Sequence, residues 1–110
     1  MNHQRLKCYQ MAMSTAKAMP SLIARWPKGY YYLSDQLKRA LASIVLNIAE
    51  GNSRTSPVER RRFFTISMGS ASEVSSILDI AFAYHLIDQS KFHYHQDILL
   101  QIYKILYKLR

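Results

Sequence analysis

Apolar residues recur at steps of three and four along four stretches of the chain, and this period predicts amphipathic helices. The stretches cover about residues 5–25, 32 or 34 to 50, 56–85 and 88 or 90 to 109. Pro20 lies inside the first stretch and removes a backbone donor there, so we expect a local distortion. Because short connections join the four segments, the sequence predicts an all-α fold. The expected architecture is an antiparallel, up-down-up-down four-helix bundle in a single domain, residues 1–110.

Local signals mark where these helices begin and end. The run Ser-Pro-Val-Glu at 56–59 combines an N-cap serine, a proline at the first helical position and a glutamate that completes a capping box. Asp88 or Ser90 is placed to cap the fourth helix. Gly51 is placed to end the second helix as a left-handed C-terminal cap. Gly69, inside the third helix, would allow a neighbouring helix to approach closely.

The second helix is apolar on two sides. At about 100° per residue, one side gathers a sufficient core stripe: Leu33, Leu37, Ala40, Leu41, Ile44 and Ile48. A further side, on which Lys38 is the only charge, is formed by Ala42, Val45, Leu46 and Ala49. A helix that is apolar on two sides is covered on two sides. We therefore expect these four residues to form an interface between copies of the chain in a homo-oligomer.

A narrow polar strip lies between the two apolar sides of this helix: Gln36, Arg39, Ser43, Asn47 and Glu50. Two interpretations remain open. Arg39, Asn47 and Glu50 would line a binding site, or they would join Glu73 of the third helix in a hydrogen-bonded ion-pair network. Such a network would set the register of helices or subunits. The structural interpretation is favoured because no nucleophile or metal-binding cluster accompanies the strip.

The charge of the chain narrows the range of partners. Fifteen Lys and Arg residues against seven Asp and Glu residues give a formal net charge of +8. A charge of this size attracts nucleic acid, an anionic membrane surface or an acidic protein, although it also serves solubility alone. A membrane surface is disfavoured because no helix is both strongly basic and strongly apolar on opposite faces.

Basic residues fall in sequence regions that an up-down bundle brings to one end, namely the two termini and the turn between the second and third helices. The predicted phosphate contacts are Lys38, Arg54, Arg60, Arg61, Lys104 and Lys108. Eight tyrosines, among them the run at 30–32, would stack on unpaired bases or, at most positions, lie at core edges and interfaces.

No residue pattern predicts catalysis, a cofactor or a metal site. His93 and His95 are two residues apart and therefore lie on different faces of a helix. Neither a Gly-x-Ser-x-Gly elbow nor a Gly-rich phosphate loop occurs. The single cysteine, Cys8, is expected to be a core residue rather than a nucleophile. A chain with one cysteine forms no internal disulfide, which favours a reducing compartment. With no signal-peptide pattern and no apolar run of roughly 18 residues, a cytoplasmic location is expected.

Two sequence elements resemble a known family. Residues 33–40 (LSDQLKRA) and 43–51 (SIVLNIAEG) closely resemble the signature of small bacterial four-helix-bundle proteins encoded in intervening sequences of 23S rRNA genes. Residues 62–64 (RFF) and 68–73 (MGSASE), together with Glu59, look like the second half of that signature. The accessory variability determinant (Avd) proteins of diversity-generating retroelements are similar in fold and size. Val45, where proline is common, and Arg60 and Arg61, where apolar residues are common, depart from the pattern.

The resemblance implies a bundle that assembles into a five-fold, barrel-like ring, a homopentamer. For the Avd proteins it also implies binding to structured RNA and to a partner reverse transcriptase. The sequence thus favours a non-catalytic, basic, ring-forming accessory protein that binds structured RNA, with a reverse transcriptase as a candidate partner. The alternative is an oligomeric scaffold that recruits an acidic protein and does not bind RNA.

Overall fold

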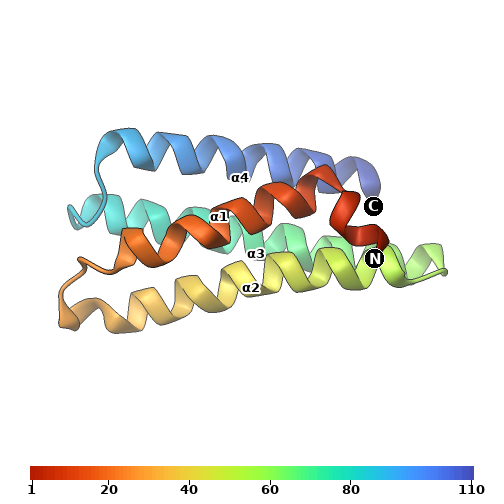
Figure 1. The fold of residues 1–110 in the computed structure, drawn as a ribbon, viewed down its shortest axis with the longest axis horizontal. Coiled ribbons are helices and arrows are strands. Elements are labelled where there is room, and N and C mark those ends of the chain that lie inside the picture. The colour runs from red at the N-terminus through yellow and green to blue at the C-terminus, as the bar shows by residue number, and fades with distance from the viewer.

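The computed structural model contains helices and no strands (Figure 1). The four α-helices are α1 (Lys7–Ile23), α2 (Tyr31–Ser53), α3 (Pro57–Ala83) and α4 (Gln89–Leu109). Two short 3-10 helices, η1 (Asn2–Arg5) and η2 (Lys28–Tyr30), precede α1 and α2. The helices run alternately in opposite directions along a body of 44 × 23 × 21 Å, which confirms the predicted four-helix bundle.

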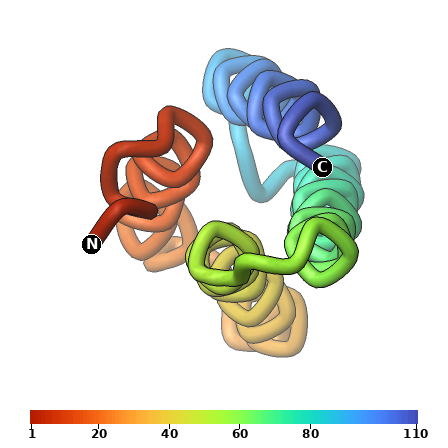
Figure 2. The backbone as a smooth tube through the Cα atoms, turned by 90° about the vertical axis from the view of Figure 1, so that its right-hand side faces the viewer, coloured from red at the N-terminus to blue at the C-terminus, as the bar shows by residue number.

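Each helix packs beside the next one in the chain, and α4 returns to pack beside α1 (Figure 2). Both termini and the connection between α2 and α3 lie at one end of the bundle (Figure 1). The connections between α1 and α2 and between α3 and α4 lie at the other end. A hydrogen bond joins these last two connections, because Trp26 Nε1 donates to the Leu86 carbonyl at 3.0 Å.

The core runs along the bundle axis. All six residues of the predicted α2 core stripe are buried, which confirms the register read from their spacing. They pack against side chains of every other helix, the largest fully buried of which include Met19, Phe64, Leu78, Ile102 and Leu106. Ser67 Oγ donates to the Ile44 carbonyl at 2.8 Å, so α2 and α3 are also joined by a buried hydrogen bond.

The prediction that Gly51 ends α2 is wrong. The helix continues to Ser53, Gly51 is buried inside it, and no glycine in the chain has a positive φ. A Cβ at Gly51 would lie 2.7 Å from Cε1 of Phe64. This glycine therefore permits close packing of α3 on α2, the role expected for Gly69. Gly69 is exposed, and a Cβ there would meet nothing within 4 Å.

The predicted N-caps of α3 and α4 are confirmed, with Asp88 rather than Ser90 capping α4. Ser56 Oγ accepts the amide of Glu59 at 3.4 Å, and Asp88 Oδ1 accepts the amide of Lys91 at 2.8 Å. Only the serine half of the capping box forms. At its C-terminus, α3 stops two residues earlier than expected, because His85 adopts φ 60°. The Leu86 amide then bonds back to the Ala81 carbonyl at 2.8 Å, which is the Schellman arrangement that usually uses glycine.

Candidate nucleic-acid interface

The α2–α3 connection and the C-terminal turns of α4 bring positive charge to one end of the bundle (Figure 1). We call this surface the basic end, and its members are Arg54, Arg60, Arg61, Arg62, Lys104, Lys108 and Arg110. Five of the six predicted phosphate contacts belong to it. Lys38 does not, because it lies in α2 sixteen residues before Arg54, the C-cap of that helix, which is about 24 Å along the axis.

Arg60 holds the backbone where α2 ends. Its Nη1 donates to the Asn52 carbonyl at 3.1 Å and to the Arg54 carbonyl at 3.2 Å. Its guanidinium also lies 5.5 Å from the ring centroid of Phe64. These carbonyls are among those that a helix C-terminus leaves without partners, so Arg60 supplies a cap that local sequence signals did not reveal.

Arg54 and Arg62 share one aromatic ring. Their guanidinium carbons lie 5.2 Å and 5.7 Å from the ring centroid of Phe63. Arg54 Nη2 also bonds Glu50 Oε2 at 3.0 Å, which is the single salt bridge of the chain. Because both partners are about half exposed, the pair contributes little stability and leaves Arg54 accessible to a ligand.

Three cations of the basic end have no partner in the chain. Arg61, Lys104 and Lys108 are exposed and make no hydrogen bond or salt bridge through their side chains. Lys108 lies in the last turn of α4, and Lys104 lies about one turn before it. These side chains can contact phosphates without first breaking an internal bond.

No hydrogen bond or salt bridge joins the four residues of the predicted polar network to one another within the protomer. Glu50 pairs with Arg54, and Asn47 Nδ2 donates to the carbonyl of Ser43 at 2.8 Å. In both cases the partner lies one turn away along α2. Arg39 is exposed without a salt bridge.

Of the four, only Glu73 takes part in the polar link between α2 and α3, and its partner is Gln36. The hydroxyls of Ser43 and Ser70 lie 2.6 Å apart, and Gln36 Nε2 donates to Glu73 Oε2 at 3.4 Å. Residues of the polar strip therefore face α3, through the pairs Ser43–Ser70 and Gln36–Glu73 that the sequence did not reveal.

The four residues predicted to form an oligomer interface lie on the outer side of α2. Leu46 is 62% exposed, and Ala42 is also exposed. Val45 and Ala49 are half-buried, and Val45 packs against the core of its own protomer. Within one protomer, this outer strip is covered only in part.

Two titratable side chains are buried. Burial raises the pKa of the Cys8 thiol, which favours its protonated form. His95 is 5% exposed, and its Nδ1 has no hydrogen-bond partner. Burial, and secondarily the positive charge of Lys91, lowers the pKa of His95. No three His, Cys, Asp or Glu side chains gather closely enough to hold a metal ion.

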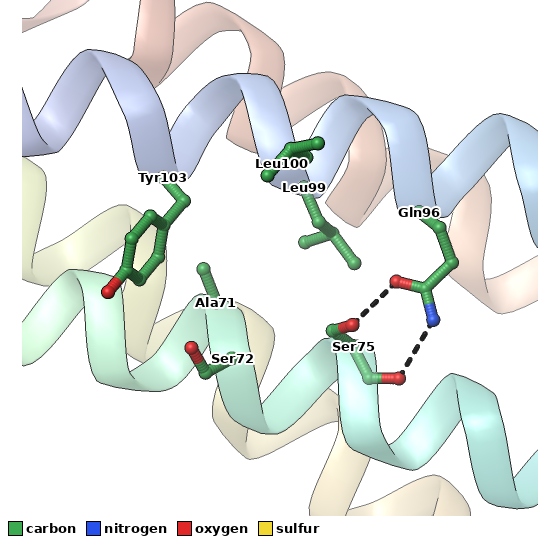
Figure 3. A pocket seen from close by; sticks show the side chains of 7 residues that line it. All are labelled: Ala71, Ser72, Ser75, Gln96, Leu99, Leu100 and Tyr103. Atoms are coloured by element: carbon green, nitrogen blue, oxygen red, sulfur yellow. Dashed lines mark hydrogen bonds between the residues drawn. The ribbon is translucent and has the colours of Figure 1, made fainter.

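A small cavity of about 120 Å³ opens between α3 and α4 (Figure 3). On one side, Ser75 Oγ donates to Gln96 Oε1 at 2.6 Å, and Gln96 Nε2 donates to the Ser75 carbonyl at 3.0 Å and to Asp79 Oδ1 at 3.0 Å. The rest of the lining is formed by Ala71, Ser72, Leu99, Leu100 and Tyr103 (Figure 3). Because the amide is fully engaged with α3, these residues fasten the two helices together.

No helix combines the length and apolarity needed to cross a membrane.

Comparisons with known proteins identify the family. A crystal structure of a protein of unknown function from the S23 ribosomal protein family of Bacteroides thetaiotaomicron is similar, with a TM-score of 0.83 and 18% identity over 92% of each chain. At this identity the similarity shows the fold alone. No curated protein matches the sequence. The family model described as 23S rRNA-intervening sequence protein matches residues 4–108. Because this match spans nearly the whole chain, the protein belongs to the 23S rRNA-intervening sequence protein family.

Proposed function

We propose that this protein is a non-catalytic accessory protein that binds structured RNA through its basic end. The observation that carries the proposal is the gathering of unpartnered cations there, with Arg61, Lys104 and Lys108 all exposed. The chain has a net charge of +8 and a single internal salt bridge. Lys and Arg side chains that neutralise phosphates release counterions, and this release supplies most of the affinity of sequence-independent binding.

The helix dipole of α3 supports the same conclusion. Arg60, Arg61 and Arg62 follow directly on its first turn, where Glu59 is the only acidic residue. The N-terminal end of a helix carries positive partial charge, so cations close to it are unfavourable. A polyanion bound at this end would relieve the repulsion among the three arginines and between them and the helix. Binding of a polyanion is therefore favoured at this end of the bundle.

Association of copies would strengthen binding further. The outer strip of α2 offers an apolar surface, centred on Leu46, that a second copy can cover. In a closed ring each protomer would present its own basic end, and several weak contacts on one RNA would act together. The pentameric state and the recruitment of a reverse transcriptase remain predictions of the sequence resemblance.

Fluorescence anisotropy with a labelled structured RNA tests the proposal. The affinity should fall linearly with salt on a log-log plot between about 50 and 200 mM. A Lys104→Ala/Lys108→Ala double variant should reduce the slope by about 1 to 2, since each phosphate contact contributes close to one. The matched control is Lys28→Ala/Lys91→Ala, which removes the same charge from the opposite end and should leave the slope unchanged.

The result that would overturn the proposal is the absence of binding at low salt. That outcome would favour the scaffold interpretation, in which the same cations select an acidic protein partner. Equal effects of the two double variants would instead place RNA contacts over the whole surface and remove the special role of the basic end.

A further inference from the structure

The arginine–aromatic contacts of the protein lie at the basic end alone. In each of the four contacts a guanidinium lies over an aromatic ring: Arg54 over Phe63, Arg60 over Phe64, Arg62 over Phe63 and Arg110 over Tyr107. The rings belong to the first turns of α3 and the last turn of α4, which meet at this end (Figure 1). Positive charge and aromatic surface are therefore combined in one place.

The four contacts differ in how exposed the aromatic ring is to solvent. Phe64 is 0% exposed, so its contact with Arg60 belongs to the packing of the core. Phe63 is half-buried and orients Arg54 and Arg62 at the surface. Tyr107 is 59% exposed, and the Arg110 guanidinium lies 4.6 Å from its ring centroid. The Arg110 amide continues the hydrogen bonding of α4 by donating to the Leu106 carbonyl, which helps to hold Arg110 beside the ring.

The opposite end of the bundle also carries aromatic side chains, but no arginine lies over them. There the rings pair with one another, with Tyr30 5.6 Å from Tyr84 and Phe82 4.4 Å from Phe92 between centroids. The tyrosine run at 30–32, which the sequence suggested for base stacking, lies at this end. The length of the bundle separates it from the basic end, so it cannot share one short RNA element with the predicted phosphate contacts.

An arginine that lies over an aromatic ring keeps the N–H groups at its edge available for bonds to phosphate. An exposed ring beside it offers a face to a base. Duplex RNA can use only the phosphate contact, because its bases are stacked and paired and its deep groove is too narrow for side chains. Unpaired nucleotides can use both the phosphate contact and the aromatic ring, since each unstacked base has a face that an aromatic side chain can cover.

We propose that the basic end binds unpaired nucleotides of RNA, with one base stacked on Tyr107 beside Arg110 and neighbouring phosphates held by Arg54 and Arg62. This inference rests on the proposed RNA-binding function and specifies its ligand as a loop, a bulge or a single-stranded end. Tyr107 contributes surface without charge, so its effect on binding is separable from that of the cations.

The test compares two exposed tyrosines of α4. Tyr94 is 60% exposed and Tyr107 is 59% exposed, but Tyr94 lies near the start of the helix, about 20 Å from Tyr107. Affinities of Tyr107→Leu and Tyr94→Leu are measured by anisotropy for a single strand, a hairpin and a blunt duplex of equal length. Tyr107→Leu should weaken binding of the single strand and the hairpin by at least about fivefold and spare the duplex. Tyr94→Leu should change none of them.

The salt dependence supplies a second readout. Because neither substitution removes a charge, the slope of the log-log plot should stay that of the unchanged protein for both variants. Tyr107→Trp keeps a stacking face and should restore the affinity for the single strand. The proposal is overturned if Tyr107→Leu weakens all three RNAs alike or none of them, or if the unchanged protein prefers the duplex. Failure of the unchanged protein to bind any RNA would reject the proposed function itself.

Discussion

Gly51 of α2 and Phe64 of α3 fit together because glycine has no side chain: a Cβ on Gly51 would lie 2.7 Å from Cε1 and 2.8 Å from Cδ1 of the ring. Gly51→Ala should therefore force α2 and α3 apart and lower the free energy of unfolding by about 1–3 kcal/mol. Chemical denaturation measures the change. In Gly69→Ala the added methyl meets open space, so that control should gain up to about 1 kcal/mol from helix propensity. Equal responses of the two variants would refute the packing role of Gly51.

Arg60 and Arg61 are adjacent but should respond differently to substitution. Arg60→Ala removes the bonds to the Asn52 and Arg54 carbonyls and should lower the free energy of unfolding by about 1–2 kcal/mol. Arg61→Ala should change stability by less than about 0.5 kcal/mol but weaken RNA binding. Thermal unfolding and anisotropy on the same samples separate the two effects. A stability loss in Arg61→Ala as large as that in Arg60→Ala would contradict this division.

His95 should make the fold sensitive to acid. Its pKa is lowered in the folded protein, so the unfolded chain binds a proton more readily. Stability should be constant above the ordinary histidine pKa of about 6.5 and fall as the pH drops below it, until the folded-state pKa is passed. Melting temperatures between pH 5 and 8 should show a smaller fall for His95→Leu than for the unchanged protein. His93→Gln, at an exposed position, should retain the full fall, and an unchanged profile in His95→Leu would exclude this origin.

Replacing His85, which has a left-handed backbone conformation, by glycine should stabilise the protein. A residue with a Cβ pays about 1–2 kcal/mol for this conformation, whereas glycine adopts it freely. His85→Gly should therefore raise the free energy of unfolding by about 1 kcal/mol. His85→Ala keeps the Cβ and should give no such gain. The pair of variants, compared by thermal denaturation, separates backbone strain from loss of the imidazole.

The outer strip of α2 should control association. Leu46→Lys places a charge at a position that is 62% exposed, so the protomer should still fold while the oligomer dissociates. Val45→Lys is less informative because Val45 packs against the core. Multi-angle light scattering measures the mass in solution. Leu100→Lys, at a 53% exposed position on α4, is the matched control; dissociation by that variant alone would place the interface on α4.

Periodicity predicted the bundle and the α2 core because burial of a stripe is a property of one helix and is visible in its spacing. It did not predict the role of Gly51, since a glycine near a helix end fits both a C-terminal cap and a close contact. Only the position of Phe64 in the folded chain distinguishes them.

The sequence also predicted only part of the candidate site. The up-down topology correctly brought together Arg54, at the end of α2, and Lys108, in the last turn of α4. Lys38 was grouped with them by closeness in sequence, although a rise of about 1.5 Å per residue carries it far down the helix. The role of Arg60 as a cap depends on where α2 stops, and the cation–π geometry of Tyr107 depends on a side-chain conformation. Neither is encoded in residue spacing.

The hydrogen bond from Trp26 to the Leu86 carbonyl should make the two ends of the bundle differ in how readily they open locally. It fastens two connections that are sixty residues apart in the chain, so all four helices are tied together at that end. At the other end a single connection, between α2 and α3, joins two of the helices. Local opening should therefore start where the RNA is expected to bind. Amide hydrogens in the first turns of α1 and the last turns of α4 should exchange fastest, and bound RNA should slow the exchange in α4.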